Sequence, residues 1–206
     1  MDEPAMPRGG PPAGEAPAAP PRPPPLEMVW PARLLGNPPA GPVPEGCRLR
    51  QFRPQDRAAY LDLMRLAGFQ DWGEDRLDGM LKKILPRGFF VIEERATGLL
   101  VATAMATHNP EPRHPFGGEL GWVAGHPGHA RRGLGRAVCA AVVRRYSEIN
   151  YERIYLKTDD WRLAALKVYL GLGFEPLLYL PEMAARWEAV CRALGRPFTP
   201  EAWPKA

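Results

Sequence analysis

The feature that most constrains the fold of this chain is a glycine-rich, basic segment between a strand-like run and a helix-like run. It reads Gly-His-Pro-Gly-His-Ala-Arg-Arg-Gly-Leu-Gly-Arg over residues 125–136, after the apolar run 119–124 and overlapping the helix-like run 134–146. Where a strand turns into a helix through glycines, backbone N–H groups and the positive end of the helix dipole point at one place. The segment holds three arginines and no acid. It therefore predicts a binding site for a pyrophosphate.

This segment differs from the two commoner phosphate-binding loops. The sequence has no Gly-x-x-x-x-Gly-Lys-Ser/Thr string, and Val138 stands where a dinucleotide-binding fingerprint starting at Gly133 has its third glycine. The segment resembles the acetyl-CoA pyrophosphate loop of the GNAT superfamily of N-acetyltransferases, usually Gln/Arg-x-x-Gly-x-Gly/Ala after a His-Pro pair. Gly133, Gly135 and the His-Pro pair match it. Ala130 departs from it at the Gln/Arg position, where the neighbouring arginines or the backbone alone would supply the contact.

A second motif strengthens the resemblance. The GNAT superfamily carries the pattern Ala-x-x-x-Tyr-x-x-x-Gly-Phe, and this chain matches it at Ala165, Tyr169, Gly173 and Phe174. Arg162 stands where the family commonly has an asparagine. Two spaced motifs in the right order are far more specific than either alone, and the resemblance covers roughly residues 47–180.

The resemblance implies an α/β (α+β) fold with a mixed, mostly antiparallel central sheet that contains a splayed parallel strand pair and is flanked by helices. Apolar periodicity agrees with the element order of that fold. Strands are expected at 47–52, 89–94, 99–108, 119–124, 154–158 and 174–180, and helices at 54–66, 74–85, 134–146, 161–172 and 182–194. The segment 109–118 is expected to be a long loop.

The end of the chain departs from the family, which usually has a returning seventh strand. Pro181 intervenes, and an amphipathic helix is expected at about 181–195. Three roles stay open for this helix: a cover over one face of the sheet, a wall of the acceptor pocket, or a homodimer contact.

Residues 1–44 differ in kind from the rest of the chain. They hold 15 of its 26 prolines, and such a segment buries too little apolar surface to offset its ordering entropy. We expect a disordered N-terminal extension over 1–44 and an acetyltransferase domain over 45–206. Leu26–Trp30 and the pair Leu34-Leu35 are apolar exceptions that could hold the end of the extension against the domain.

Charge and composition narrow the partners. The net charge of +4 suits an anionic cofactor, and no basic stripe with interleaved aromatics suggests nucleic acid. No apolar run approaches the ~18 residues of a membrane span, and no secretory signal is recognisable. Three widely spaced cysteines show no metal-type spacing, which predicts a reducing, cytoplasmic protein without a metal site. Cys139 is expected in the core, and His108 and His114 at the surface.

The resemblance implies acetyl-CoA as co-substrate and direct attack of an amine in a ternary complex. Tyr169 is the candidate proton donor to the CoA thiolate, because an intrinsic pKa near ~10 exceeds that of a thiol near ~8.5; a purely structural tyrosine stays the alternative. Glu119 is the candidate base. Asp159, Asp160 and an ordered water are its rivals, although an N-cap role would explain at least one aspartate.

The remaining candidate residues bind acetyl-CoA. Backbone N–H groups are expected to hold the oxyanion and the pantetheine at Trp122, Val123, Ala124 and Gly125. The pyrophosphate is expected at Arg131, Arg132, Gly133, Leu134, Gly135 and Arg136. Strand alternation is expected to place Glu119, Gly121 and Val123 on one face.

The acceptor is not identified by the sequence. Trp72 and Trp122 either line an acceptor pocket or belong to the core. A small amine, an amino-sugar-linked thiol precursor and a protein amine all stay compatible. A non-catalytic acyl-CoA-binding sensor and an interaction protein that acts through its proline-rich segment remain the alternatives.

Overall fold

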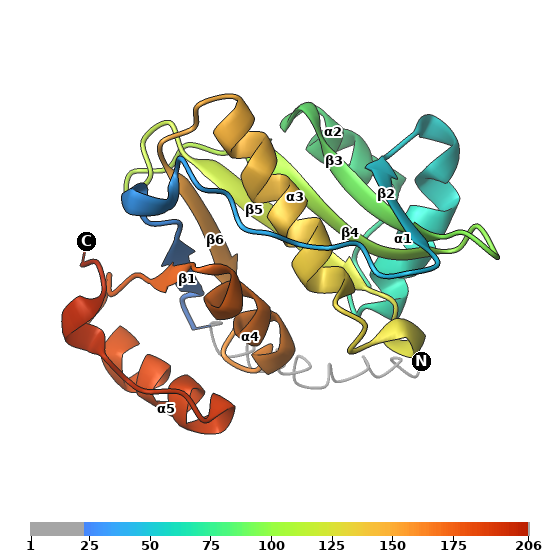
Figure 1. Cartoon of the computed structure of the whole chain (residues 1–206). Helices are drawn as coiled ribbons and strands as arrows, with labels where there is room; N and C mark the ends of the chain where they lie inside the picture. Colours follow the sequence, from blue (N-terminus) through green and yellow to red (C-terminus); the bar gives the residue numbers. More distant parts are fainter. Residues whose placement is uncertain (1–22, 206) are drawn as a thin grey trace, which may run out of the picture.

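The computed structural model describes residues 23–205 as a seven-stranded sheet with helices on both faces (Figure 1). The strand order is β2-β3-β4-β5-β6-β1-β7. The strands are β1 Leu26–Val29, β2 Cys47–Gln51, β3 Ile84–Glu94, β4 Leu100–His108, β5 Gly118–Gly125, β6 Ile154–Thr158 and β7 Glu175–Pro176. The α-helices are α1 Arg57–Leu66, α2 Glu74–Leu81, α3 Leu134–Glu148, α4 Leu163–Leu172 and α5 Met183–Leu194. Short 3-10 turns are η1 Ala32–Leu34, η2 Pro54–Asp56, η3 Pro127–His129 and η4 Pro200–Ala202.

One strand pair of this sheet is parallel and splays apart. All other neighbouring strands pair antiparallel, whereas β5 and β6 run in the same direction. Their pairing is limited to Gly118 with Ile154 and Glu119 with Tyr155, although β5 continues to Gly125. The predicted fold class, a mostly antiparallel sheet with a splayed parallel pair, is confirmed.

Two apolar clusters hold the helices on opposite faces of the sheet. The larger contains the buried side of α3, with Cys139 fully buried as expected, together with residues of α4 and α5. The smaller contains residues of α1 and α2 and includes Trp72, which is 2% exposed and therefore belongs to the core. In Figure 1, α3 crosses one face of the sheet while α1 and α2 lie on the other. The cleft described below opens where these two layers meet the splayed strands.

The N-terminal segment corrects the predicted domain boundary at residues 44 and 45. Strand β1 lies inside the sheet, antiparallel to β6 on one side and to β7 on the other, and all four of its residues are buried (Figure 1). Trp30 then packs edge-on against Phe174 with ring centroids 5.1 Å apart. Each buried large apolar side chain contributes roughly 1.5–3 kcal/mol, which offsets the ordering cost that the prolines suggested. Residues 1–22, also predicted disordered, lie outside the described part.

The pairing of β1 with β7 also replaces an expected feature. The family usually has a seventh strand that returns after the Gly-Phe strand, and Pro181 predicts that this chain lacks it. In the structure, the N-terminal strand β1 pairs instead with β7, which follows the Gly-Phe motif. The C-terminal helix α5 lies within the predicted range and sends Met183, Trp187 and Val190 into the larger cluster. Helix α5 contacts α4, and its three expected roles stay predictions.

Two predicted element boundaries were wrong. The predicted helix 74–85 ends at Leu81, and β3 begins at Ile84. Pro86 follows closely, and a proline both lacks the N–H that a helix needs and disfavours helical backbone before it. The predicted strand 174–180 contains only the two residues of β7. Beyond β7 the Leu177 N–H still donates to the Glu27 carbonyl, but the Leu178 N–H donates to the Pro204 carbonyl, so the pairing with β1 ends there. None of the helices within residues 23–205 is long and apolar enough to cross a membrane.

Candidate active site

A β-bulge in β5 shapes the site. Gly121 pairs with Met105 on β4, and Ala124 pairs with Thr103. The two residues Trp122 and Val123 therefore oppose the single β4 residue that lies between Thr103 and Met105. Trp122 adopts a positive φ of 53°. Such a bulge adds one residue to a strand and redirects the side chains after it.

The bulge corrects the predicted alternation along β5. Trp122 packs with the smaller cluster, at ring centroids 4.7 Å from Trp72, whereas Val123 packs with the larger cluster on the other face. The expectation that Glu119, Gly121 and Val123 share one face is therefore wrong for Val123. Trp122 both contacts the core and lines the cleft. Its expected place in the core therefore does not exclude a place in the wall of the cleft.

A cleft of about 250 Å³ opens between the splayed strands. Its walls come from β5, from the end of β6, from one side of α4 and from the segment before α2. The lining residues are Pro25, Phe69, Glu119, Leu120, Gly121, Trp122, Val123, Lys157, Thr158, Asp159, Arg162, Ala165 and Tyr169. The structure thus brings Glu119 and Tyr169, predicted from separate motifs, into one cleft. Its volume suits a slender chain better than a whole drug-sized ligand, which fills pockets of roughly 300–1,000 Å³.

The glycine-rich segment forms a row of open backbone donors. After β5 ends at Gly125, η3 leads to Gly133, whose φ of +82° favours glycine and which caps the start of α3. The first helical hydrogen bond of α3 runs from the Ala137 N–H to the Gly133 carbonyl. Within residues 23–205, no N–H group of residues 131–136 donates to a backbone carbonyl. Open donors at the positive end of a helix dipole can hold an anion, and the pyrophosphate site stays a prediction.

The three arginines of this segment point to different partners. Arg136 donates to the Gly171 carbonyl at 2.8 Å, so its guanidinium is held by the end of α4. Arg132 lies 3.4 Å from a carboxylate oxygen of Glu94. Arg131 is exposed, adopts a φ of 63°, and makes no side-chain hydrogen bond or ion pair within the described residues. Among the predicted pyrophosphate ligands, Arg131 therefore has the side chain most available to an anion.

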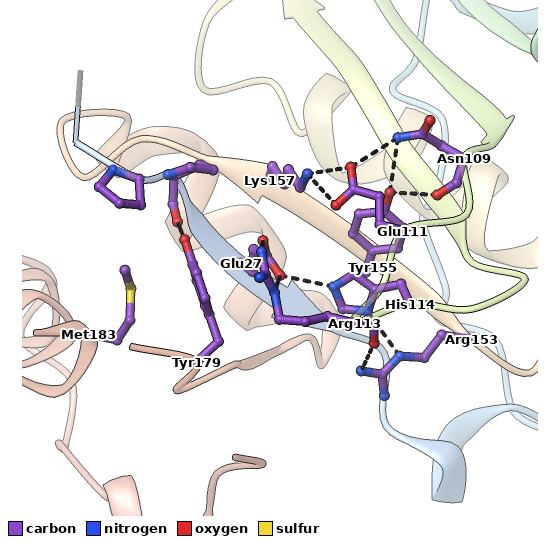
Figure 2. Close-up of polar contacts among 12 residues, drawn as sticks. Glu27, Asn109, Glu111, Arg113, His114, Arg153, Tyr155, Lys157, Tyr179 and Met183 are labelled. Carbon is purple, nitrogen blue, oxygen red and sulfur yellow. Dashed lines mark hydrogen bonds and ion pairs between the residues drawn. The ribbon is translucent and has the colours of Figure 1, made fainter. Parts of the chain in front are cut away.

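Glu119 lines the cleft and belongs to a polar network. Figure 2 shows the other members of this network, Asn109, Glu111, Tyr155 and Lys157. Asn109 donates from Nδ2 to Glu119 Oε2 at 2.8 Å, and the Tyr155 hydroxyl donates to the Asn109 carbonyl at 2.7 Å. Lys157 Nζ lies 2.6 Å from Glu111 Oε2. Burial raises the pKa of Glu119, while the positive charge of Lys157 and the Asn109 hydrogen bond partly oppose that rise. A carboxyl group with a raised pKa is suited to accept a proton.

This network was missed by sequence reasoning. The segment from Asn109 to Gly118 was expected only as a loop, and no motif marked Asn109, Glu111, Tyr155 or Lys157. The available signal was the alternation along β6, which places Tyr155 and Lys157 on one face. Their approach to Glu119 depends on the parallel register of β5 and β6, which alternation alone does not give.

Tyr169 lies on α4 and faces the cleft with Ala165. Burial raises the pKa of its hydroxyl well above the usual value, so the group stays protonated at neutral pH. Its ring packs edge-on against Phe174 at 6.3 Å. Gly173 between them has a φ of +118° and ends α4, and a Cβ there would lie 3.1 Å from Leu34. The motif that contains Tyr169 therefore orients both the hydroxyl and the core that supports it.

The rival aspartates are held by arginines. Asp160 accepts from Arg186 Nε at 2.9 Å, and this hydrogen bond lowers the pKa of its carboxyl group. Asp159 lines the cleft and accepts from Arg162 Nε at 3.0 Å. Helix α4 begins at Leu163 with no side-chain cap. The predicted capping role is therefore wrong for both aspartates, whose carboxylates pair with guanidinium groups instead.

The two loop histidines differ from each other. His108 is exposed as expected, with its Nδ1 2.9 Å from the Tyr151 hydroxyl. His114 was also expected at the surface but is fully buried, stacked on Tyr155 at 3.9 Å and 2.9 Å from Glu27 Oε2. The reason is β1, which brings a buried carboxylate under the loop. Burial opposes ionisation of Glu27, but hydrogen bonds from His114 and Arg113 outweigh it and lower the pKa to about 2.

Residues 51–174 match the model of the Acetyltransferase (GNAT) family. The chain belongs to this family. Within residues 23–205 of this GNAT domain, no three His, Cys, Asp or Glu side chains are grouped so as to hold a metal ion. The two motifs that carried the resemblance lie within the matched residues.

Two curated relatives are named mycothiol acetyltransferase. The chain is 30% identical over 160 residues to the protein from Frankia casuarinae, covering 71% of this chain and 46% of that one. It is 30% identical over 146 residues to the protein from Thermobispora bispora, covering 66% and 49%. The chain spans about half the length of the curated relatives it matches.

Solved structures show the same GNAT fold. A GCN5-related N-acetyltransferase from Sphaerobacter thermophilus superposes with a TM-score of 0.58 at 21% identity, over 75% of this chain and 49% of that one. The diaminobutyrate acetyltransferase EctA from Paenibacillus lautus, solved with L-2,4-diaminobutyric acid and coenzyme A, gives a TM-score of 0.51 at 19% identity, over 63% and 75%. At these identities the likeness concerns the fold alone.

Proposed function

We propose that the chain transfers an acetyl group from acetyl-CoA to a small-molecule amine by direct attack in a ternary complex. The observation that carries the proposal is the cleft between β5 and β6. The open N–H groups of residues 131–136 follow β5 along the chain, and the cleft itself holds a carboxylate and a protonated tyrosine. An acyl carrier with a pyrophosphate fits this arrangement of an anion site beside a narrow channel.

The backbone of the chain is proposed to hold the co-substrate. The N–H groups of 131–136 receive the pyrophosphate, with Arg131 as the most available side chain. The strand segment Trp122–Gly125 lines the pantetheine, and N–H groups at the bulge face the thioester oxygen. Because these donors are fixed by the fold, they stabilise a developing oxyanion with little reorganisation.

The chemistry needs one base and one acid. Glu119 accepts a proton from the acceptor ammonium, directly or through a water, and the neutral nitrogen attacks the thioester carbonyl carbon. The carbon–nitrogen bond forms, the carbon–sulfur bond breaks, and Tyr169 donates its proton to the CoA thiolate. The nitrogen loses its second proton as the amide forms, and a proton returned through water restores the Tyr169 hydroxyl. A raised pKa favours Glu119 as a base near neutral pH, and burial keeps Tyr169 protonated until the thiolate forms.

The charges of the cleft favour an acceptor with one ammonium group. Lys157 pairs with Glu111 and Arg162 with Asp159, so these four charges cancel in pairs. Glu119 is left without an ion-pair partner within the described residues. The relatives named mycothiol acetyltransferase support a small-molecule acceptor over a protein amine. An amino-sugar-linked thiol precursor is one such small molecule.

A panel of amines assayed for release of CoA thiol tests the proposal. Release that depends on both acetyl-CoA and an amine is the expected result, and amino-sugar-linked and simple amines belong in the same panel. CoA binding without turnover of any amine would favour a non-catalytic sensor instead. Loss of a cellular effect on deletion of residues 1–22, with turnover intact, would favour an interaction protein; a longer deletion would also remove β1.

A further inference from the structure

One lysine lies inside the proposed catalytic cleft. Lys157, on β6, is the single lysine among the cleft-lining residues of the described chain. Its side chain is 27% exposed and points toward Glu111, with Nζ 2.6 Å from Oε2 (Figure 2). The chain therefore carries a primary amine of its own where an acceptor amine is expected to enter.

The strand register places Lys157 across the cleft from the bulge. Glu119 pairs with Tyr155 in the last hydrogen-bonded step between β5 and β6. Two residues further along each strand come Gly121 and Lys157, on the same faces as Glu119 and Tyr155. A Cβ on Gly121 would meet no atom within 4 Å. The space directly over Gly121, in the strand segment where the thioester is proposed to bind, is therefore open.

Proton acceptors for the lysine are already in place. Glu111 contacts the ammonium group directly, and Asn109 Nδ2 bridges the two carboxylates, at 3.4 Å from Glu111 and 2.8 Å from Glu119. An amine attacks only in its neutral form, so an ammonium group must first give its proton to such a base. The same base that serves an external amine can serve Lys157.

We propose that Lys157 is an acetyl acceptor within its own chain, and this inference rests on the proposed function. Lys157 Nζ loses a proton to the carboxylate pair, attacks the thioester carbonyl carbon of bound acetyl-CoA, and forms a carbon–nitrogen bond. The carbon–sulfur bond breaks, the CoA thiolate leaves, and Tyr169 donates a proton to it. The nitrogen loses its second proton as the amide forms, and a proton returned through water restores the Tyr169 hydroxyl. The net reaction converts the lysine ammonium and acetyl-CoA into an acetamide, CoA thiol and one released proton.

Acetylation of Lys157 would close the site to other amines. The acetamide carries no positive charge, so Glu111 loses its ion-pair partner and two carboxylates stay close together. Like charges disfavour each other's ionised form, which weakens Glu119 as a base at a given pH. The added group also occupies the space over Gly121. Self-acetylation therefore inhibits transfer to external amines. An abundant acceptor amine would delay this inhibition by competing with Lys157 for the cleft.

Peptide mapping by mass spectrometry tests the proposal on the full chain. The protein is incubated with acetyl-CoA and no amine, and acetylation is followed at every lysine over time and on dilution. We expect one acetyl group at Lys157, formed at a first-order rate that does not depend on protein concentration. Lys157→Arg, which keeps the ion pair with Glu111, should lose this modification, whereas Lys167→Arg on the exposed side of α4 should not. An acceptor amine should slow the reaction in the wild type.

Other outcomes overturn the inference. Acetylation spread over exposed lysines such as Lys167 at similar rates would indicate chemical modification by the thioester. A rate that falls on dilution would indicate transfer between chains. If the protein turns over an external amine while Lys157 stays unmodified, the self-acetylation is refuted and the proposed function stands. If no lysine is modified and no added amine increases the release of CoA thiol, both are refuted.

Discussion

The two ends of the cleft are built in different ways. The proposed CoA end is a continuous segment, residues 125–136, whose open groups are backbone N–H donors beside the left-handed Gly133. The proposed acceptor end is assembled from side chains on β1, the loop after β4, β5 and β6, joined by hydrogen bonds of Asn109, Tyr155 and Glu27. Backbone recognition suits a constant co-substrate, because it is set by local chain geometry. Side-chain recognition at the other end can change with the acceptor while the fold stays the same.

The largest expected effect comes from disturbing the backbone-built end. Gly135→Glu puts a carboxylate in the first turn of α3, where the open N–H groups are proposed to bind the pyrophosphate. At a CoA concentration of about 100 times Kd, the wild type should gain about 2.7 kcal/mol of stability, and the variant should gain none. Thermal unfolding with and without CoA measures this difference.

Gly135→Ala is the matched control for that variant. A Cβ at this position would lie 3.8 Å from Val168, which is an ordinary contact. The alanine variant should therefore keep the CoA-induced shift. If the glutamate variant also kept it, the pyrophosphate would have to bind elsewhere than residues 131–136.

The next effect concerns the group between the two ends. Tyr169→Phe should lower the turnover rate by roughly 100-fold, at the low end of general acid–base contributions, while CoA affinity stays near the wild-type value. The phenyl ring keeps the packing on Phe174 and removes only the proton. Single-turnover kinetics under saturating acetyl-CoA would measure it, and an unchanged rate would return Tyr169 to a structural role.

A smaller effect is expected from the buried anchor of the acceptor end. Glu27→Gln weakens the bonds that hold Arg113 and His114, and losing a hydrogen bond to a charged group costs about 2 kcal/mol. The Glu27 pKa is lowered to about 2, so its contribution is complete above the unfolded-state pKa near ~4.3 and lost as pH falls toward 2. The stability gap between wild type and variant should therefore close as pH falls through that window. Chemical denaturation at several pH values measures the gap, and a constant gap would contradict the ion-pair account.

The difference between the two ends of the cleft explains which features the sequence could predict. Sequence motifs identify residues whose roles depend on local conformation or helical spacing. These residues are Gly133, Gly135, Tyr169 and Gly173. The β5–β6 splay was expected from the family resemblance. In contrast, the burial of His114 and the role of Asn109 depend on β1, on the parallel register and on the bulge at Trp122. Proline content also concealed β1 as a strand, because only Leu26, Met28 and Val29 carry its apolar signal inside a segment whose composition indicates disorder.

The smallest expected effect, and the one most specific to the acceptor end, comes from Asn109→Ala. The Asn109 hydrogen bond favours the ionised form of Glu119, so its removal should raise the pKa of Glu119 further above the ordinary value. A base is active when deprotonated, so the rate under saturating acetyl-CoA should rise with pH in both proteins, with the ionisation displaced to higher pH in the variant. Turnover near neutral pH should fall several-fold, about 1 kcal/mol, and recover at high pH, while CoA binding is unchanged.

Glu119→Gln provides the reference for that profile, because glutamine keeps the shape of the side chain but cannot accept the proton. Its pH profile should lose the ionisation that Asn109→Ala only displaces. If both variants kept the wild-type profile and only weakened acceptor binding, Glu119 would position the amine without deprotonating it. Asp159 would then be the next base to test, because it lines the same cleft and Arg162 contacts it through Nε. Asp160 is a weaker candidate, since Arg186 already lowers the pKa of its carboxyl group.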